Sequence, residues 1–431
     1  MNILRRRFLA TLGLVTVSGI TGGLMSCDNI GQQQSTSSSP SITNNNGMWN
    51  KIRSDFKHDP KKIHMAGMLL ATHPRQVQDA INRYRDELNH NPAAYVNESF
   101  LPMNGEIREV AAKYMNAKPE EVANTDSTTM GTALVFAGLQ IRNDQEIITH
   151  EYDYYSTHQS IEYLSSRTGV KVRKIPSYKN IHQVTKEEIV DNLINAIKPE
   201  TRLVTATWVH SSTGLKVPVK EISSRLAEIN ASRDLNDRVI FFVDGVHGFG
   251  VEDTPVAELD CDFFAAGTHK WIFGPRGTGI LWGHSRAHQD VKPIIPTFNQ
   301  SGGWGGTMSP GGFKAFEHEW ALIEAFKFHE EIGKSKVKER LHAFARQLKE
   351  GLDNIDRITL ITPMEESLSS GIVCFDVDGM QPVDVVRALR EKNIEASDTP
   401  YSPTYARLTP GIYNTEEEIE LVLKAVYEVS R

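Results

Sequence analysis

The chain has 431 residues, a formal net charge of −7 at pH 7 and a hydrophobic content of 39%. Proteins that bind nucleic acid normally carry a basic face, so the acidic balance argues against a nucleic-acid partner. The length allows two folded domains with sizeable cores. The composition therefore predicts a soluble globular protein and nothing more specific.

An export signal is predicted at the start of the chain. Residues 5–9, RRRFL, resemble a twin-arginine signal, and residues 24–27, LMSC, resemble a lipoprotein cleavage box. A basic start, a short apolar run and small residues before a cysteine are the layout of such signals, with an uncleaved N-terminal anchor as the alternative. We expect a signal over residues 1–27, a periplasmic location and a membrane tether through Cys27.

After the signal we expect a polar linker and then an N-terminal arm. Residues 28–47 are rich in Ser, Asn and Gln and lack aromatic side chains, which predicts a disordered linker. Residues 48–75 would form an N-terminal arm that leads into the first domain.

Strands and helices are predicted to alternate from about residue 107. Helical stretches such as 186–197 and 219–232 separate short runs that are apolar on both faces. Such runs are typical of a parallel sheet covered by helices, so we expect a doubly wound α/β domain over residues 76–300. The predicted strands are 146–150, 170–175, 202–209, 239–245, 261–267 and 279–283.

The pattern changes after a glycine-rich break at residues 301–312. A long helical tract over 315–355 leads into short strands and a closing helix over 415–430. This order predicts a smaller α+β domain over residues 301–431.

Cysteine use argues against a disulfide or zinc scaffold. Besides Cys27, the chain has only Cys261 and Cys374, and each lies in an apolar, strand-like run. We expect both to be buried, inert thiols.

Polar side chains follow the predicted strands where ligands bind in α/β folds, at their carboxyl ends. Asp244 and His247 follow one strand, and His269 and Lys270 follow the next. A buried carboxylate is costly unless it is paired. Residues 127–129, Ser-Thr-Thr, precede a helical run and predict an anion site. A metal site at Asp244 and the two histidines is the weaker alternative.

Pyridoxal 5′-phosphate requires three groups of this kind: an acid, a lysine and a helix N-terminus that can bind phosphate. The amine of Lys270 would form a Schiff base with the aldehyde. Asp244 would keep the pyridine nitrogen protonated, which makes the ring an electron sink. The helix start would hold the 5′-phosphate.

The motifs around these residues resemble class V aminotransferase-like enzymes of fold type I, most nearly the isopenicillin N epimerase-like group. The stretches that carry the resemblance are VDGVHGFG, AELDCDFFAAGTHKW, GPRGTG, HEY (150–152), STGLKVP (212–218) and RLTPGIYNT (407–415). The resemblance implies a large domain with a mostly parallel seven-stranded sheet flanked by helices, and a small C-terminal α+β domain. It also implies a homodimer with shared active sites.

The resemblance assigns further roles. Tyr152 would stack on the cofactor ring, His247 would lie near its phenolic oxygen, and Arg407 would grip the substrate α-carboxylate. Ser211 stands where relatives often have Asn. The implied phosphate contacts are Thr128, Thr129, Thr268 and His269, with Thr307 lent to the partner subunit's site.

Three classes of function remain open. The first is transamination or epimerisation at the α-carbon of an amino acid or its derivative, with Lys270 moving the proton. The second is carbon–sulfur cleavage without a catalytic cysteine, because residues 393–408, before and including the substrate arginine, contain none. The third is a non-catalytic binding protein, against which the intact lysine, aspartate and arginine argue. Substrate choice is expected in loops without a readable motif, at 65–73, 91–99 and 397–405.

Overall fold

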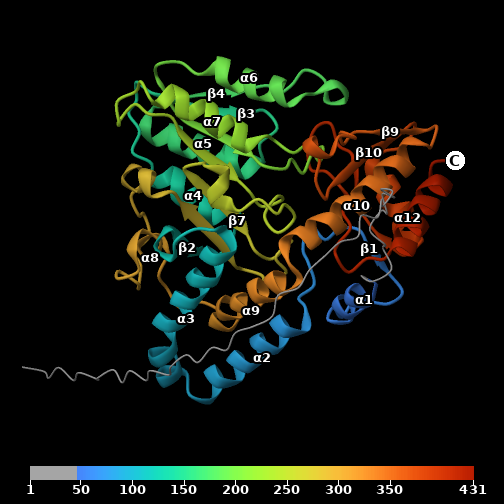
Figure 1. Cartoon of the computed structure of the whole chain (residues 1–431), viewed down its shortest axis with the longest axis horizontal. Helices are drawn as coiled ribbons and strands as arrows, with labels where there is room; N and C mark the ends of the chain where they lie inside the picture. Colours follow the sequence, from blue (N-terminus) through green and yellow to red (C-terminus); the bar gives the residue numbers. More distant parts are fainter. Residues whose placement is uncertain (1–45) are drawn as a thin grey trace, which may run out of the picture. The chain divides into compact units, whose positions relative to one another are not determined.

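A seven-stranded sheet forms the centre of the larger part of the molecule (Figure 1). The computed structural model describes residues 46–431. The sheet order is β2-β8-β7-β6-β5-β3-β4, and all pairs are parallel except those of β8 with β2 and β7. The mostly parallel sheet is thereby confirmed. Its strands are β2 Val122–Thr125, β3 Glu146–His150, β4 Lys171–Ile175, β5 Thr201–Thr207, β6 Ile240–Asp244, β7 Phe263–Gly267 and β8 Gly279–Gly283.

Helices cover both faces of this sheet, because successive side chains of each buried strand point to opposite faces. On one face Phe242 and Phe263 pack with α4 and α5; on the other Phe241 and Phe264 pack with α2, α3, α7 and α9. The doubly wound arrangement is therefore confirmed. The helices are α2 Arg75–His90, α3 Pro92–Met115, α4 Thr128–Gly138, α5 Tyr155–Thr168, α6 Lys186–Ala196, α7 Val219–Asn230 and α9 Phe316–Ile332.

A second core lies around a four-stranded antiparallel sheet of order β12-β13-β10-β9. Helices α10 and α12 pack on each other, and α10 packs on β9 and β10 (Figure 1). This α+β unit confirms the expected C-terminal architecture. Its elements are α10 Lys334–Asp353, β9 Ile358–Leu360, β10 Val373–Val377, α11 Pro382–Glu391, β12 Ser397–Asp398, β13 Ala406–Leu408 and α12 Glu416–Val429.

The N-terminal arm runs alongside both cores. Its helix α1, Asn46–Ser54, begins inside the expected linker, and β1, Ile63–His64, pairs in parallel with β11, Ile394–Glu395. The expected signal, Cys27 and linker residues up to 45 lie outside the described residues. No helix within residues 46–431 is long and apolar enough to cross a membrane.

The long helical tract predicted over residues 315–355 is wrong, because it is two helices. Gly333 has φ +93°, a conformation that favours glycine, and it separates α9 from α10. The glycine-rich break also contains a short helix, α8 Gly303–Met308, which packs on β2. Helix α9 packs on α2 and α3, which belong to the core of the large sheet. The apolar side chains of α8 and α9 therefore pack with the larger part of the molecule.

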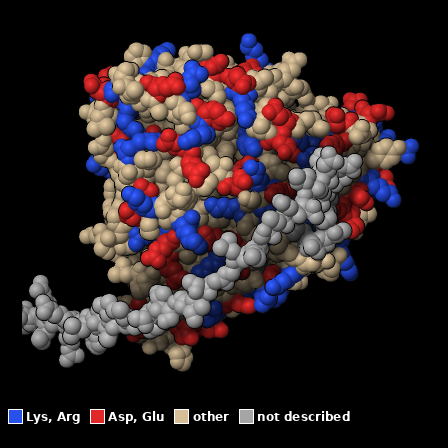
Figure 2. Space-filling model, viewed as in Figure 1, with Lys and Arg blue, Asp and Glu red and all other residues tan. Residues whose placement is uncertain are grey.

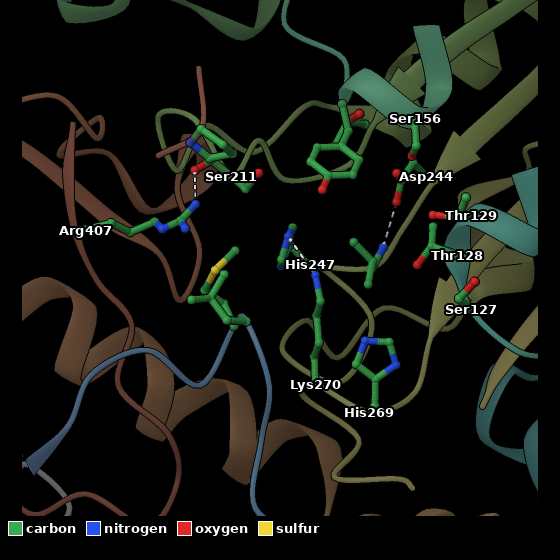
Figure 3. Close-up of a pocket in the computed structure, with 16 residues that line it drawn as sticks. Ser127, Thr128, Thr129, Ser156, Ser211, Asp244, His247, His269, Lys270 and Arg407 are labelled. Atoms are coloured by element: carbon green, nitrogen blue, oxygen red, sulfur yellow. Dashed lines mark hydrogen bonds between the residues drawn. The ribbon is translucent and has the colours of Figure 1, made fainter. Parts of the chain in front are cut away.

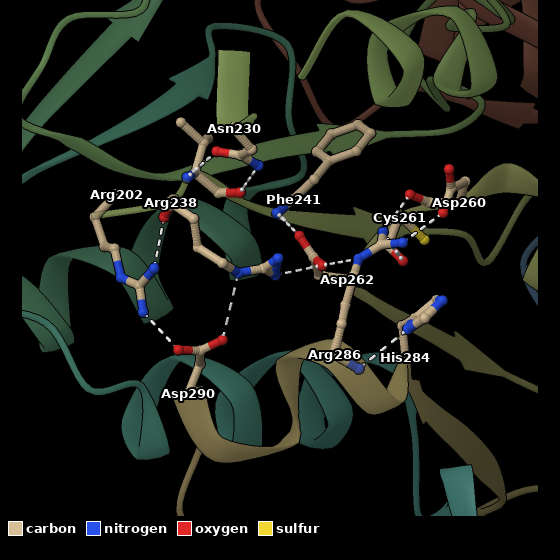
Figure 4. A network of polar contacts seen from close by, with 11 residues as sticks. Arg202, Asn230, Arg238, Phe241, Asp260, Cys261, Asp262, His284, Arg286 and Asp290 are labelled. Carbon is tan, nitrogen blue, oxygen red and sulfur yellow. Dashed lines mark hydrogen bonds and ion pairs between the residues drawn. The ribbon is translucent and has the colours of Figure 1, made fainter. Parts of the chain in front are cut away.

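The two ends of the strands in the large sheet are lined by different kinds of side chain. The carboxyl ends of β5, β6 and β7 border the cavity of Figure 3. Near the opposite ends lies a buried network of arginines and aspartates (Figure 4). In it Arg202 pairs with Asp290 at 2.6 Å, and Arg286 Nε donates to Asp262 at 2.7 Å. Asp262 also accepts from Arg238 and from the Phe241 N–H, which ties β6 to the start of β7.

Replacement of Asp262 with alanine is expected to lower the free energy of unfolding by about 3–5 kcal/mol, because Arg238 loses a buried partner. Chemical denaturation followed by circular dichroism measures the change. The matched control is Asp144→Ala, since Asp144 pairs with Arg142 on the surface with 66% of its side chain exposed. An equal effect of the two substitutions would contradict a structural role for the network.

Acidic and basic side chains are interspersed over the face of the described chain that Figure 2 shows. Ion pairs between exposed side chains, such as that of Arg142 with Asp144, contribute little to stability.

Candidate active site

A cavity of about 350 Å³ lies at the carboxyl ends of the central strands (Figure 3). It brings together most of the residues that the sequence singled out, from α4, β6, the turn after β7 and β13. Those that line it are Thr128, Thr129, Ser211, Asp244, His247, His269, Lys270 and Arg407.

Lys270 lies in the turn after β7 and points its amine into the cavity (Figure 3). Its Nζ lies 3.4 Å from His247 Nε2. Burial lowers the pKa of Lys270 to about 8, although the charge of Asp244 opposes that shift. A large part of the amine is therefore neutral near pH 8, which is the form that attacks a carbonyl carbon.

Asp244 ends β6 on another wall of the same cavity. Its Oδ1 accepts a hydrogen bond from the Val246 N–H at 3.2 Å. Burial raises the pKa of Asp244, while that hydrogen bond and the charge of Lys270 lower it. Within residues 46–431 neither the buried carboxyl group of Asp244 nor the partly buried amine of Lys270 forms an ion pair, although both line the cavity. A ligand that bonds to the Asp244 carboxyl group and to the Lys270 amine would give each of them a further polar partner.

His247 holds a defined tautomer between two neighbours. Its Nδ1 accepts from Trp271 Nε1 at 3.4 Å, since an indole N–H can only donate. Burial and the nearby Lys270 charge lower the pKa of His247, so the ring is neutral and its proton is on Nε2. That N–H faces Lys270 Nζ, which accepts it as a neutral amine.

An anion site is built at the start of α4. Ser127 Oγ caps the Met130 N–H, while the first helical N–H groups, of Thr128 and Thr129, have no partner within the helix. Opposite them, His269 Nδ1 is buried without a hydrogen-bond partner in the described chain. Helix starts attract anions, so this corner fits a phosphate.

Gly267 leaves room for this corner. Its N–H donates to Thr128 Oγ1 at 2.7 Å, and an added Cβ would lie 2.8 Å from His269 Cε1. The packing of the His269 ring against the end of β7 therefore favours glycine here. The hydroxyl proton of Thr128 stays available to an anion, because Thr128 Oγ1 is the acceptor of that bond.

Arg407 lies on β13 and reaches the cavity from the small sheet. Its side chain is almost fully buried. Backbone and hydroxyl oxygens fix it: Nη1 donates to Ser211 O at 2.7 Å, and Nε donates to Ser397 Oγ at 3.0 Å. Within residues 46–431 Arg407 has no carboxylate partner, and burial lowers its pKa. A buried guanidinium that has no acidic partner is suited to bind a ligand that carries a carboxylate.

Tyr152 does not line the cavity. Its ring stacks on Tyr178, with centroids 5.0 Å apart and an interplanar angle of 9°. Tyr154, two residues later, lines the cavity instead. Three tyrosines lie within residues 152–155, so the sequence offered no means to choose between them. Tyr154 is the aromatic side chain from this turn that a bound ring would meet.

Two predicted phosphate contacts also lie away from the cavity lining. The Thr268 hydroxyl is buried and hydrogen-bonds Thr278 Oγ1 at 2.6 Å, behind His269. Thr307 is on α8, where its hydroxyl donates to Gly303 O at 2.9 Å. Neither lines this chain's cavity, and the role of Thr307 in a partner subunit stays a prediction.

Met68, Leu69 and Pro400 come from the loops 65–73 and 397–405, where substrate choice was expected, and they line the cavity. Four lining residues were missed by sequence reasoning: Tyr154, Ser156, Thr207 and Val246. Thr207 ends β5 beside Asp244, and its hydroxyl and N–H both donate to Asp153 Oδ1 at 2.8 Å. Asp153 is buried and also accepts from Thr149 and Thr205, both at 2.8 Å. This carboxylate holds the ends of β3 and β5 together beneath the cavity.

The two cysteines of the described chain are buried and lie outside the cavity lining. Burial raises the pKa of Cys374 to about 12, so its thiol is protonated at neutral pH. The expectation that both thiols are buried is confirmed. Within residues 46–431 no group of three or more His, Cys, Asp or Glu side chains is placed to hold a metal ion.

Comparisons with known proteins point to one family. Residues 70–422 match the aminotransferase class-V family. The isopenicillin N epimerase of Amycolatopsis lactamdurans is 25% identical, over 89% of this chain and 99% of its own. A probable cysteine desulfurase of Pyrococcus abyssi is 24% identical, over 88% of this chain and 96% of its own.

Solved structures show the same fold. The cystine C–S lyase C-DES, in complex with its product cysteine persulfide, gives a TM-score of 0.78 at 22% identity, over 86% of this chain and 98% of its own. The apo cysteine desulfurase of Thermococcus onnurineus gives 0.76 at 21% identity, over 88% of this chain and 97% of its own. The fold-type expectation is thus confirmed.

Proposed function

The chain belongs to the class V aminotransferase family of pyridoxal 5′-phosphate enzymes, and from this premise we propose that it transaminates or epimerises an amino acid or amino-acid derivative at the α-carbon. One observation carries the proposal. Three groups line one cavity: the partly buried amine of Lys270, the buried carboxyl group of Asp244 and the buried guanidinium of Arg407, which has no acidic partner within residues 46–431.

The lining offers partners for three groups of the cofactor. The start of α4 and His269 would hold the phosphate, Asp244 the pyridine nitrogen and Lys270 the aldehyde carbon. When bound, the cofactor supplies an electron sink that weakens the bonds to the substrate α-carbon. Arg407 would orient the substrate by its α-carboxylate.

Lys270 would then move the proton at the α-carbon. Its burial favours the neutral amine, which accepts a proton, and the neighbouring His247 stays neutral and adds no competing charge. Transamination and epimerisation share this proton transfer and differ in where the proton is returned.

A carbon–sulfur lyase is the second candidate. Relatives at 24% identity bear the name cysteine desulfurase, and a structural neighbour is titled a cystine C–S lyase. A persulfide-forming route needs a cysteine thiol at the substrate, and neither cysteine of the described chain lines the cavity. The candidate is therefore a lyase that uses no thiol.

Incubation of the holoenzyme with a panel of amino acids separates these reactions. Keto acid formed in the presence of an acceptor supports transamination, and loss of chirality supports epimerisation. Release of pyruvate with sulfide from cysteine, or of pyruvate with cysteine persulfide from cystine, would favour the lyase. A bound cofactor without any turnover would contradict the proposal.

The lowered pKa of Lys270 predicts how the apoprotein takes up the cofactor. The rate of covalent uptake should rise with pH and reach half its maximum at about 8, because only the neutral amine attacks the aldehyde. Stopped-flow absorbance across a pH series measures this rate. A rise centred at the ordinary lysine value of 10.5 would contradict the burial argument.

We also propose that the chain forms a homodimer. Phe298, Phe313 and Leu101 expose 54%, 83% and 53% of their surface, and the two phenylalanine rings lie 6.0 Å apart. Exposed apolar clusters of this kind mark interaction sites, and a second copy here would bring α8 with Thr307 to the interface. Light scattering on the purified protein would contradict this proposal if it gave the mass of one chain.

Export by the twin-arginine route and lipid attachment at Cys27 are proposed from the sequence. This route moves folded proteins, which agrees with a cofactor acquired in the cytoplasm. Replacing Arg5 and Arg6 with lysine should leave the protein in the cytoplasm. Continued export of that variant would refute the signal.

A further inference from the structure

The N-terminal arm forms a wall of the cavity and connects two of its functional side chains. Met65 O accepts from the Thr409 N–H at 2.8 Å, two residues after Arg407. The Ala71 N–H donates to His269 O at 3.2 Å, next to Lys270. Residues 65–71 therefore run from the proposed carboxylate site to the lysine turn.

The arm turns tightly between these anchors. The Leu69 N–H donates to Ala66 O at 3.0 Å. A Cβ on Gly67 would lie 2.9 Å from the Tyr413 hydroxyl, so the turn lies close against Tyr413. The next two side chains, Met68 and Leu69, line the cavity.

Met68 and Leu69 differ in exposure. Met68 is 2% exposed, whereas Leu69 is 51% exposed, so Leu69 lies where the cavity meets solvent. Pro400, from the loop before β13, adds a further apolar group to the lining. These three residues give the lining an apolar surface that no cofactor contact uses.

The charged groups of the cavity are all accounted for. Asp244, Lys270 and Arg407 are the acidic and basic residues of the lining besides its two histidines, and burial lowers the pKa of both His247 and His269. The proposed function assigns the three charged groups to the pyridine nitrogen, the aldehyde and the α-carboxylate. Within residues 46–431 the lining has no further charged group to pair with a substrate side chain. A charged side chain there would lose hydration without gaining a partner.

We propose that the enzyme selects amino acids with an uncharged, apolar side chain, and that Leu69 is a specificity-determining residue that contacts this side chain together with Met68. This inference rests on the proposed function and adds its substrate class. In this proposal, the loop at residues 65–73 of the N-terminal arm contacts the substrate side chain.

Equilibrium binding to the holoenzyme tests the substrate class. Leucine, methionine, glutamate and lysine are titrated separately, and the change in the absorption band of the bound cofactor gives each dissociation constant. Leucine and methionine should bind at least about tenfold more tightly than glutamate and lysine. Equal or tighter binding of either charged amino acid would overturn the inference.

The chain offers a matched pair of variants for the role of Leu69. Leu69→Arg should shift the ratio of the leucine and glutamate dissociation constants by about tenfold toward glutamate, because it removes an apolar contact and adds a partner for the acid. Leu70→Arg is the control, since Leu70 is the adjacent residue, is 49% exposed and lies outside the lining. Both side chains are at the surface, so both variants should fold.

The outcomes separate this inference from the function on which it rests. If amino acids perturb the cofactor band without side-chain preference, or if the two arginine variants behave alike, the role of Leu69 is wrong and the α-carbon chemistry stands. If no amino acid perturbs the band of a fully loaded enzyme, the proposed function fails and the substrate class with it.

Discussion

Replacement of Lys270 with alanine is expected to lower kcat/KM by about 10⁴-fold or more. Lys270 is the amine that attaches the cofactor and the base that moves the proton, so one substitution removes both contributions. The cavity holds no second lysine among its lining residues. Steady-state kinetics on the substrate found in the panel measures the loss, and absorbance shows whether the cofactor still binds covalently.

Lys349 provides the matched control. It is also buried, and burial also lowers its pKa to about 8, yet its Nζ donates to Pro363 O at 3.0 Å and to Met364 O at 2.8 Å, outside the cavity. Lys349→Met should therefore reduce stability and leave the cofactor band unchanged. Activity close to wild type in Lys270→Ala would refute the assignment of the base.

Replacement of Arg407 with lysine is expected to weaken substrate binding by about 10²–10³-fold, with little change in the cofactor band. The guanidinium is planar, and bonds to Ser211 O and Ser397 Oγ fix its orientation. An ammonium group keeps the charge and loses both this orientation and the two-pronged grip on a carboxylate. Titration of the holoenzyme with substrate measures the dissociation constant.

Arg340 is the comparison residue for this variant. It is also largely buried, and it donates to Ile412 O at 2.9 Å and Asn414 O at 2.6 Å without lining the cavity. Arg340→Lys should leave substrate affinity unchanged. If Arg407→Lys bound substrate as tightly as wild type, the carboxylate would have to bind elsewhere.

The central strands and the residues at their ends could be predicted from sequence. Short apolar runs without alternation identify strands buried on both faces, and a charged residue at the end of such a run or shortly after it lies near the carboxyl end of the strand. Asp244 and Lys270 follow this pattern, and the structure places both in the cavity lining. Strand β2 was missed because Val122–Thr125 has only two apolar residues.

The choice among neighbouring residues in a turn could not be predicted. Tyr152 and Tyr154 are two residues apart with the same chemistry, and only the course of the backbone after β3 decides which one faces the cavity. Thr268 and His269 are adjacent, and the Thr268 hydroxyl bonds Thr278 while His269 lines the cavity. Such outcomes depend on tertiary contacts that a linear pattern does not contain.

The position of the N-terminal arm beside the cavity could not be predicted from the sequence either. Residues 65–71 reach the cavity through backbone hydrogen bonds to Thr409 and His269, more than 190 residues away in sequence. Backbone bonds leave no side-chain signature. The loop was expected to influence substrate choice, and its contacts now indicate which of its side chains would do so.

The covalent bond between Lys270 Nζ and the cofactor is the central claim, and borohydride reduction followed by peptide mass mapping tests it most directly. After reduction of the holoenzyme, the mass of the reduced cofactor should appear on the peptide that contains Lys270 and be absent from peptides that contain Lys216 or Lys349. Attachment to a different lysine, or no attachment in a protein that retains bound cofactor, would contradict the account.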